Sequence, residues 1–393
     1  MTTRRRRAMA ASLLTLALSA PLLDTAPPAL AQSVQTSGSQ VPYTSGLALP
    51  LPTGPYTVGR RALHLVDRHR TDPWVPRAGN RELMVSVSYP ARGTSGSPAA
   101  YMTDDEAQLL LEARGLGGVV PAATVAGART HAREGVLPAP GRFPLVLLSP
   151  GFSMPRTTLT SIADDLASRG YVVASVDHAY ESVGTAFPGG RMLTCAACAQ
   201  VHTREENAAV ARGRAKDMSF VIDELTKPRR AGVLSRAIDA SRIGIAGHSI
   251  GGAAAAATMA ADHRVRAGVD LDGNFQLHPA ATGLGRRPFM MLGAESTHSP
   301  GGKETDWPEA WPHLSGWKRW LTVTGAGHFS FTDLPYLAGR LGLPDPTVPL
   351  SGERGWDITR DYVTAFFDLH LRDVPQPILT GPTAAHPEVA FQP

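Results

Sequence analysis

Short apolar runs alternate with amphipathic stretches along most of this chain. The runs at 143–149, 171–177, 242–247, 265–271, 288–293 and 319–325 have the length and composition of buried strands. Helices are expected at 157–169, 204–226, 250–261 and, near the end of the chain, at 357–371. Upstream, 81–89 alternates like a strand, and 103–113 reads as a short helix with Thr103 as its N-cap. Strands that alternate with helices predict an α/β fold with a mainly parallel central sheet and helices on both faces.

The chain is predicted to consist of a signal peptide at 1–31, a leader at 32–50 and one domain at 51–393. Residues 51–393 form one predicted domain, which begins with a loop-rich stretch at 51–59. Two insertions, near 100–142 and at 178–203, interrupt the alternation, and we expect them to act as lid-like segments that set substrate choice. Residues 32–50 are rich in Ser, Gly, Thr and Gln, which indicates a disordered leader.

The first 31 residues have the pattern of a secretory signal peptide. Four arginines at 4–7 precede an apolar stretch at 8–23, and Ala29-Leu30-Ala31 is a small-x-small cleavage pattern. We therefore expect secretion after cleavage near Ala31, by the general or the twin-arginine route, and no stable membrane insertion. Loss of the four arginines and Asp24 takes the formal net charge from +4 to about +1. No basic patch remains that favours nucleic acid.

The chain has two cysteines, Cys195 and Cys198. In an exported protein such a pair is expected to form a small disulfide. A redox pair would need a thioredoxin-like unit, and a metal site would need more ligands than His178 and His202 offer at their spacing. We expect no metal and no cofactor.

The motif Gly247-His248-Ser249-Ile250-Gly251 carries the predicted chemistry. It follows the run at 242–247 and precedes the alanine-rich stretch at 252–261. A G-x-S-x-G sequence between a strand and a helix predicts a nucleophile elbow, in which a strained turn exposes the serine hydroxyl. Ser249 is therefore the candidate nucleophile.

A serine nucleophile needs a histidine base and an acid that orients the histidine. In this architecture the order along the chain is serine, acid, histidine. His328 lies in a glycine-containing loop directly after the run at 319–325 and is the candidate base. Asp272, at the end of the run at 265–271, is the candidate acid, with Glu295 in reserve. Asp270 is expected to be a buried residue that caps backbone groups.

Two backbone amides are expected to form the oxyanion hole. Ile250 follows the nucleophile, and Phe152 lies in the turn after the run at 143–149. Met154, Phe329 and Phe331 are expected to line an apolar substrate pocket, although each could equally be an ordinary packing residue.

These motifs together resemble the platelet-activating-factor acetylhydrolase family of α/β-hydrolases, plasma type, isoform II. The resemblance rests on PTGPYTVG (52–59), RELMVSVSYPA (81–91), LLSPGF (147–152), ASRGYVVASVDH (167–178), GHSIGG (247–252) and GHFSFTD (327–333). It implies an α/β-hydrolase fold, an acid after the strand that follows the elbow, amide donors at Phe152 and Ile250, and no metal. The chain differs from the family in having Pro150 where a histidine often precedes the glycine, and Ser-Pro-Gly-aromatic at 149–152 is also similar to bacterial cutinases and polyester hydrolases.

The sequence thus predicts a secreted, monomeric serine esterase or lipase that hydrolyses carboxylic esters through a Ser249–His328–Asp272 triad and an acyl-enzyme. Short-chain or oxidised phospholipid acyl esters are the substrates that the resemblance favours. A cutinase-like polyester hydrolase is the alternative, followed by an inactive binding protein on the same fold.

Overall fold

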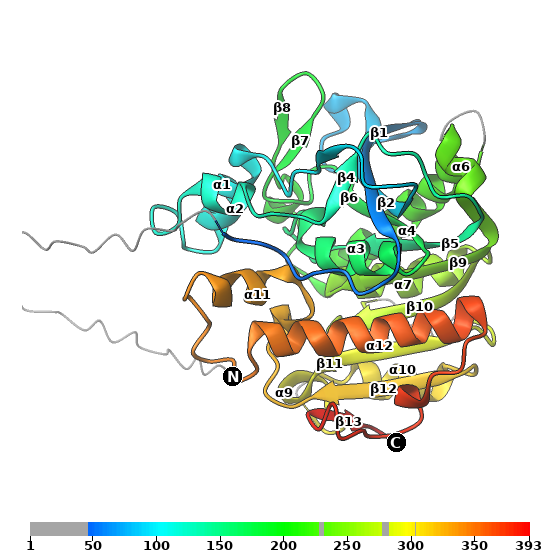
Figure 1. Ribbon diagram of the computed structural model, residues 1–393. Helices are drawn as coiled ribbons and strands as arrows, with labels where there is room; N and C mark the ends of the chain where they lie inside the picture. The colour runs from blue at the N-terminus through cyan, green and yellow to red at the C-terminus, as the bar shows by residue number, and fades with distance from the viewer. Residues whose placement is uncertain (1–45, 228–231, 277–282, 303) are drawn as a thin grey trace, which may run out of the picture. The chain divides into compact units, whose positions relative to one another are not determined.

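The computed structural model describes residues 46–227, 232–276, 283–302 and 304–393. The predicted signal peptide at 1–31 and most of the leader at 32–50 therefore lie outside the described residues. The described residues all belong to one compact unit. Figure 1 shows the order of the helices and strands along this unit.

Within the described residues, eleven strands form one sheet in the order β13-β12-β11-β10-β9-β5-β6-β2-β1-β4-β3, and β7 and β8 form a separate hairpin. The strands are β1 (Thr57–Thr71), β2 (Asn80–Ala91), β3 (Ser97–Pro98), β4 (Ala132–Glu134), β5 (Phe143–Ser149), β6 (Val172–His178), β7 (Thr185–Phe187), β8 (Arg191–Leu193), β9 (Ile238–His248), β10 (Val265–Leu271), β11 (Phe289–Ala294), β12 (Lys318–Val323) and β13 (Val389–Phe391). The six strands from β12 to β6 pair in parallel, whereas β13, β2 and β1 pair antiparallel to their inner neighbours. The predicted mainly parallel sheet is confirmed.

Helices cover both faces of this sheet. They are α1 (Asp104–Ala113), α2 (Ala122–Ala126), α3 (Thr160–Ser168), α4 (Arg204–Thr226), α6 (Val233–Ala237), α7 (Ile250–Ala261), α9 (Glu295–His298), α10 (Asp306–Ala310), α11 (Asp333–Arg340) and α12 (Gly352–Arg372), with short 3-10 turns that include η2 (Arg156–Leu159), η3 (Ala197–Ala199) and η5 (His328–Phe331). Successive residues of β5 enter different cores, because strand side chains alternate between faces. Val146 packs with α3 and α12, whereas Leu147 packs with α4 and α7.

The predicted elements from residue 143 onward are present with small shifts at their ends. The α4, α7 and β10 ranges coincide with the predicted 204–226, 250–261 and 265–271. Thr103 caps α1 through a capping box with Glu106, as its position before an acidic first turn predicts.

The largest element that the sequence did not indicate is β1. Its fifteen residues begin inside the stretch at 51–59 that reads as a loop, and they pair antiparallel with β2 along nearly their full length. On its other side β1 pairs with β4 at only two positions, so much of the strand carries exposed or half-exposed polar side chains. This edge position explains the weak apolar alternation of β1.

Candidate active site

Ser249 lies at the turn between β9 and α7, with φ 57° and ψ −126°. A non-glycine residue in this region of backbone space costs about 1–3 kcal/mol and persists only where the surroundings impose it. Here the Ser249 amide donates to the Leu271 carbonyl at 2.8 Å, and the Ser249 carbonyl accepts from the Gly252 amide at 2.8 Å. The turn therefore has the geometry of a nucleophile elbow.

Two glycines of the motif allow the elbow to approach its neighbours closely. A Cβ on Gly247 would lie 2.1 Å from the backbone of Gly251, and a Cβ on Gly251 would lie 2.1 Å from the Ser149 carbonyl oxygen. Neither distance is possible for a side chain. The spacing of the glycines thus follows from contact between the elbow, its own helix and β5.

His328 and Asp272 form a hydrogen-bonded pair at the same edge of the sheet as Ser249. His328 Nδ1 lies 2.6 Å from Asp272 Oδ2, and the histidine side chain is 44% exposed, whereas the carboxylate is 1% exposed. Burial opposes the charge on Asp272, but the hydrogen bond from His328, the charges of His298 and His328 and the Ala294 amide together outweigh it, so the pKa of the carboxyl is lowered. Glu295, the reserve acid, is exposed at the start of α9.

The second oxygen of Asp272 is also occupied. The Ala294 amide donates to Asp272 Oδ1 at 2.6 Å, and His298 Nε2 lies 3.5 Å from the same oxygen. His298 stacks on Trp307 with ring centroids 4.0 Å apart, and burial lowers the pKa of its imidazole, so the ring is neutral at pH 7. His298 is not among the predicted site residues; its position one turn after β11 was the available signal for this contact.

His248 is a second histidine whose place the sequence did not reveal. It is 1% exposed, and its Nε2 lies 2.7 Å from the His328 carbonyl oxygen. Burial, and then the charge of His328, lower the pKa of His248 to about 3, so the neutral ring donates Nε2–H to that carbonyl. His248 thus holds the His328 loop beside the elbow.

No hydrogen bond joins the Ser249 hydroxyl to His328 among the described residues. Such bonds are often long in free enzymes and tighten when substrate binds. Two contacts connect the elbow to the residues beside this pair. The Ser249 amide donates to the carbonyl of Leu271, the residue before Asp272, and the ring of His248 lies 4.6 Å from that of His328.

The two candidate oxyanion donors are neighbours in space. Ile250 is the first residue of α7, so its amide has no partner within the helix. Phe152 follows β5, and its side chain packs in one apolar cluster with Ile250 and Trp74.

The three candidate pocket residues separate into two groups. Met154 and Phe329 belong to one apolar cluster with residues of α1, α2 and α11. Phe331 instead is 2% exposed and packs in the core with α12. The backbone turns between Phe329 and Phe331 in η5, so the two rings enter different clusters.

The cysteine pair forms the predicted disulfide, Cys195–Cys198, around η3. Among the described residues, no cluster of three or more His, Cys, Asp or Glu side chains has the arrangement of a metal site. In the same part of the chain, no helix has the length and apolar character needed to cross a membrane.

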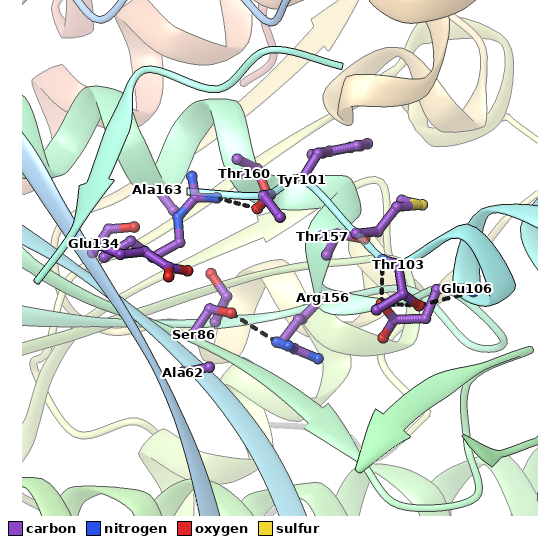
Figure 2. A pocket seen from close by; sticks show the side chains of 15 residues that line it. Ala62, Ser86, Tyr101, Thr103, Glu106, Glu134, Arg156, Thr157, Thr160 and Ala163 are labelled. Carbon is purple, nitrogen blue, oxygen red and sulfur yellow. Dashed lines mark hydrogen bonds between the residues drawn. The ribbon is translucent and has the colours of Figure 1, made fainter. Parts of the chain in front are cut away.

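A cavity of about 150 Å³ lies elsewhere, between β1, β2 and α3. Figure 2 shows that its polar side chains contact one another: Arg156 Nε donates to Ser86 Oγ at 2.8 Å, and Thr103 bonds Glu106. Neither the elbow serine nor the His328–Asp272 pair lines this cavity. We therefore place the candidate active site at the elbow.

Comparison with known proteins identifies relatives of this chain. Residues 44–193 and 219–344 match the family described as platelet-activating factor acetylhydrolase, isoform II. A probable 1-alkyl-2-acetylglycerophosphocholine esterase of Arthroderma benhamiae is 27% identical over 88% of this chain and 94% of its own length. The platelet-activating factor acetylhydrolase of Cavia porcellus is 22% identical over 75% of this chain and 70% of its own length. The solved structure of a ferulic acid esterase from Streptomyces cinnamoneus is 46% identical, covers 88% of this chain and 99% of that one, and superposes with a TM-score of 0.78.

Fold, elbow and relatives together define a carboxylic ester hydrolase of the α/β-hydrolase class. More narrowly, the chain belongs to the platelet-activating factor acetylhydrolase, isoform II, family. The predicted resemblance and the predicted ester hydrolase class are confirmed.

Proposed function

We propose that the protein is a serine esterase with Ser249, His328 and Asp272 as its catalytic triad. The observation that carries this proposal is the 2.6 Å bond from His328 Nδ1 to a buried, ionised Asp272, at the sheet edge where Ser249 occupies a strained turn. That bond places the Nδ1 proton toward Asp272, so Nε2 is free to accept a proton.

In this mechanism, His328 Nε2 takes the hydroxyl proton as Ser249 Oγ attacks the ester carbonyl. The amides of Phe152 and Ile250 donate to the oxyanion of the tetrahedral intermediate. His328 then protonates the departing alcohol and an acyl-enzyme remains. Water, deprotonated by His328, attacks the acyl carbonyl and releases the acid and Ser249.

The test is covalent labelling combined with substitution. A fluorophosphonate should label Ser249, as mass spectrometry of the modified peptide would show. Ser249→Ala should lower kcat/KM for a p-nitrophenyl ester by about 10³-fold or more, with an unchanged circular dichroism spectrum. Absence of labelling would favour the inactive binding protein, and near-wild-type activity of the variant would move the nucleophile elsewhere.

We propose phospholipid acyl esters as substrates, rather than neutral polyesters. Two relatives carry names for this kind of ester, and one observation at the site supports the choice. The guanidinium carbon of Arg114 lies 4.2 Å from the centre of the Phe329 ring, which in turn lies 5.2 Å from the ring of His328. Among the described residues Arg114 forms no ion pair, and burial alone lowers the pKa of its guanidinium. An unpaired cation beside the base suits an ester with an anionic phosphate.

The substrate proposal predicts a selective effect of Arg114→Gln. KM for a short-chain phospholipid should rise about tenfold, while kcat/KM for a neutral p-nitrophenyl ester stays within about twofold, since one charge-assisted contact is lost. Arg92→Gln, at an exposed arginine that follows β2, is the matched control. Equal losses on both substrates, or preferential hydrolysis of polyester film by the wild type, would favour the cutinase-like alternative.

We also infer that the protein is exported. The Cys195–Cys198 disulfide supports this, because such bonds persist in oxidising compartments. Expression of the full chain in a bacterial host should yield a product in the medium or periplasm whose N-terminus follows Ala31. An intact N-terminus in the cytoplasm would contradict the inference.

A further inference from the structure

A second Ser–His–Asp chain lies behind the candidate active site. Ser149 Oγ lies 3.1 Å from His178 Nε2, and His178 Nδ1 lies 2.8 Å from Asp217 Oδ2. The order of atoms is that of a catalytic triad, but Ser149 and Asp217 are 0% exposed and His178 is 2% exposed. No substrate reaches a serine buried to this degree.

The protons of this chain follow from its surroundings. Burial, and then the charge of Arg214, lower the pKa of His178, so its ring is neutral. Asp217 accepts a hydrogen bond from Nδ1–H, which leaves Nε2 to accept a hydrogen bond from the Ser149 hydroxyl. Arg214 Nη1 donates to the Ser149 oxygen at 3.2 Å. The hydroxyl is thus both donor and acceptor, a structural link rather than a nucleophile.

This link is part of a larger buried ionic network. Arg214 Nε donates to Glu181 Oε2 at 2.7 Å, and Arg81 Nη2 donates both to Glu181 Oε1 at 2.9 Å and to Asp217 Oδ2 at 2.8 Å. Each of these side chains is at most 2% exposed. Although burial alone would raise the pKa of Glu181, Arg214 and Arg81 lower it, so the charges persist. Buried ionic networks gain little net stability over apolar packing, so their retention calls for a positional reason.

The position that this network holds is the loop after β5. Arg214 Nη1 donates to the Pro150 carbonyl at 2.5 Å, directly before Gly151 and Phe152. On the far side of Phe152, the Ser153 amide donates to the Glu181 carbonyl at 2.9 Å, and the Ser153 carbonyl accepts from the Val183 amide at 2.9 Å. The loop is therefore fixed on both sides of Phe152, by one network.

We propose that Arg214 is a positioning residue for the oxyanion hole. By holding the Pro150 carbonyl and the Ser149 hydroxyl, it fixes the peptide planes that lead to Phe152 and aims the Phe152 amide at the oxyanion. This proposal rests on the proposed esterase mechanism. Removal of one oxyanion donor lowers kcat by about 10²–10³-fold, which sets the upper bound for a donor that is only misplaced.

The test compares Arg214→Lys with Arg60→Lys. Lysine keeps the charge but cannot reach Glu181, Ser149 and Pro150 together, because it has one nitrogen on a flexible stem. Arg60 is the matched control, since it is also buried and ion-paired, to Asp164 at 2.6 Å, but contacts α3 rather than the loop. We measure kcat and KM for a p-nitrophenyl ester, the thermal midpoint, and the Ki of a trifluoromethyl ketone, whose adduct with Ser249 carries an oxyanion.

For Arg214→Lys we expect kcat to fall about 10–100-fold with KM changed less than about threefold, and Ki to rise by the factor by which kcat/KM falls. Arg60→Lys should lower the thermal midpoint while kcat and Ki stay near wild type. Wild-type kcat in a folded Arg214→Lys protein, or equal losses of kcat in both variants, would overturn the proposal.

If Arg214→Lys does not fold, Ser149→Ala decides, because it removes one hydroxyl and leaves the Pro150 contact. It should lower kcat about 3–10-fold with a matching rise in Ki, and a kcat and Ki at the wild-type level would count against the proposal.

Fluorophosphonate labelling distinguishes failure of the triad from failure of the role of Arg214. Failure to label Ser249 in the wild type refutes the triad, whereas labelling of Ser249 together with unaltered kinetics of the variants refutes only the role of Arg214.

Discussion

Asp272→Asn is the substitution whose effect the structure defines most closely. The two oxygens of Asp272 have different partners: Oδ2 accepts from His328 Nδ1, and Oδ1 accepts from the Ala294 amide, each at 2.6 Å. Asparagine has one oxygen and one NH₂ group, so it can satisfy only one of these two donors.

If the new oxygen keeps the Ala294 amide, its NH₂ group faces His328 Nδ1. The imidazole must then carry its proton on Nε2, where it cannot act as a base, and in a comparable triad this costs about 10⁴-fold. If the amide flips, its NH₂ group and the Ala294 amide become two donors that face each other, which costs about 1–3 kcal/mol. The negative charge that stabilises the imidazolium is lost in either case, and this costs about 1.5–3 kcal/mol. Since 1.4 kcal/mol is about tenfold, kcat/KM should fall about 10²–10⁴-fold.

The assay is steady-state hydrolysis of a p-nitrophenyl ester, with thermal unfolding to verify the fold. Two controls make the same replacement of a carboxyl group by an amide. The first control is Asp270→Asn. Burial, and then the charge of Asp272, raise the pKa of Asp270, so this carboxyl is neutral. Its Oδ1 accepts from the Gly273 amide at 3.0 Å, and asparagine, which is nearly isosteric, can keep this bond. Glu295→Gln alters the exposed reserve acid. An Asp272→Asn protein within tenfold of wild type, or one less affected than Glu295→Gln, would refute the assignment of the acid.

Three further predictions concern the elbow, pH and the disulfide. Gly251→Ala should lower kcat/KM about 10²-fold, because its Cβ would stand 2.1 Å from the Ser149 carbonyl oxygen and force the elbow to move; activity near wild type would contradict the close contact. Burial raises the pKa of Asp333 to about 7, whereas the pKa of an aspartate in the unfolded chain is about 3.9. The neutral carboxyl therefore contributes its full stabilisation below about pH 4, and this contribution is lost as the pH rises through about 7. The free energy of unfolding should therefore drop more between pH 5 and pH 8 in the wild type than in Asp333→Asn, by up to ~3 kcal/mol, and parallel curves in denaturant titrations would count against it. Replacing Cys195 and Cys198 by serine should cost about 2 kcal/mol or less, because the disulfide closes a loop with a sequence separation of only 3; a larger loss in urea unfolding would show that it does more than shape a local turn.

Much of the fold could be read from local patterns. The buried strands and the helices between them are continuous runs whose period and caps are visible within ten to twenty residues, as α4 and its capping residue Thr203 show. By contrast, β1 is stabilised by pairing with β2 and by packing rather than by its own alternation, so no local signal distinguished it from a loop.

The candidate site divides in the same way. Ser249 and His328 lie in short motifs with glycines beside them, which the sequence displays directly. Their supporting residues depend on contacts between distant parts of the chain. Arg81 reads as an ordinary polar residue at the start of a strand, yet it bonds Asp217, 136 positions away. Such partners become visible only when the fold brings β2 and α4 together.

The placement of the chemical groups has a consequence for how such enzymes diversify. Ser249, Asp272 and His328 follow the ends of β9, β10 and β12. The helices α1 and α2, which pack with Phe329 and Met154, belong to an insertion that comes before these strands in the chain. Because the two sets belong to separate segments, the insertion can lengthen, shorten or be exchanged between relatives without altering the strands that hold the reacting groups. Chimeras that swap residues 100–142 should therefore transfer selectivity among acyl and head groups.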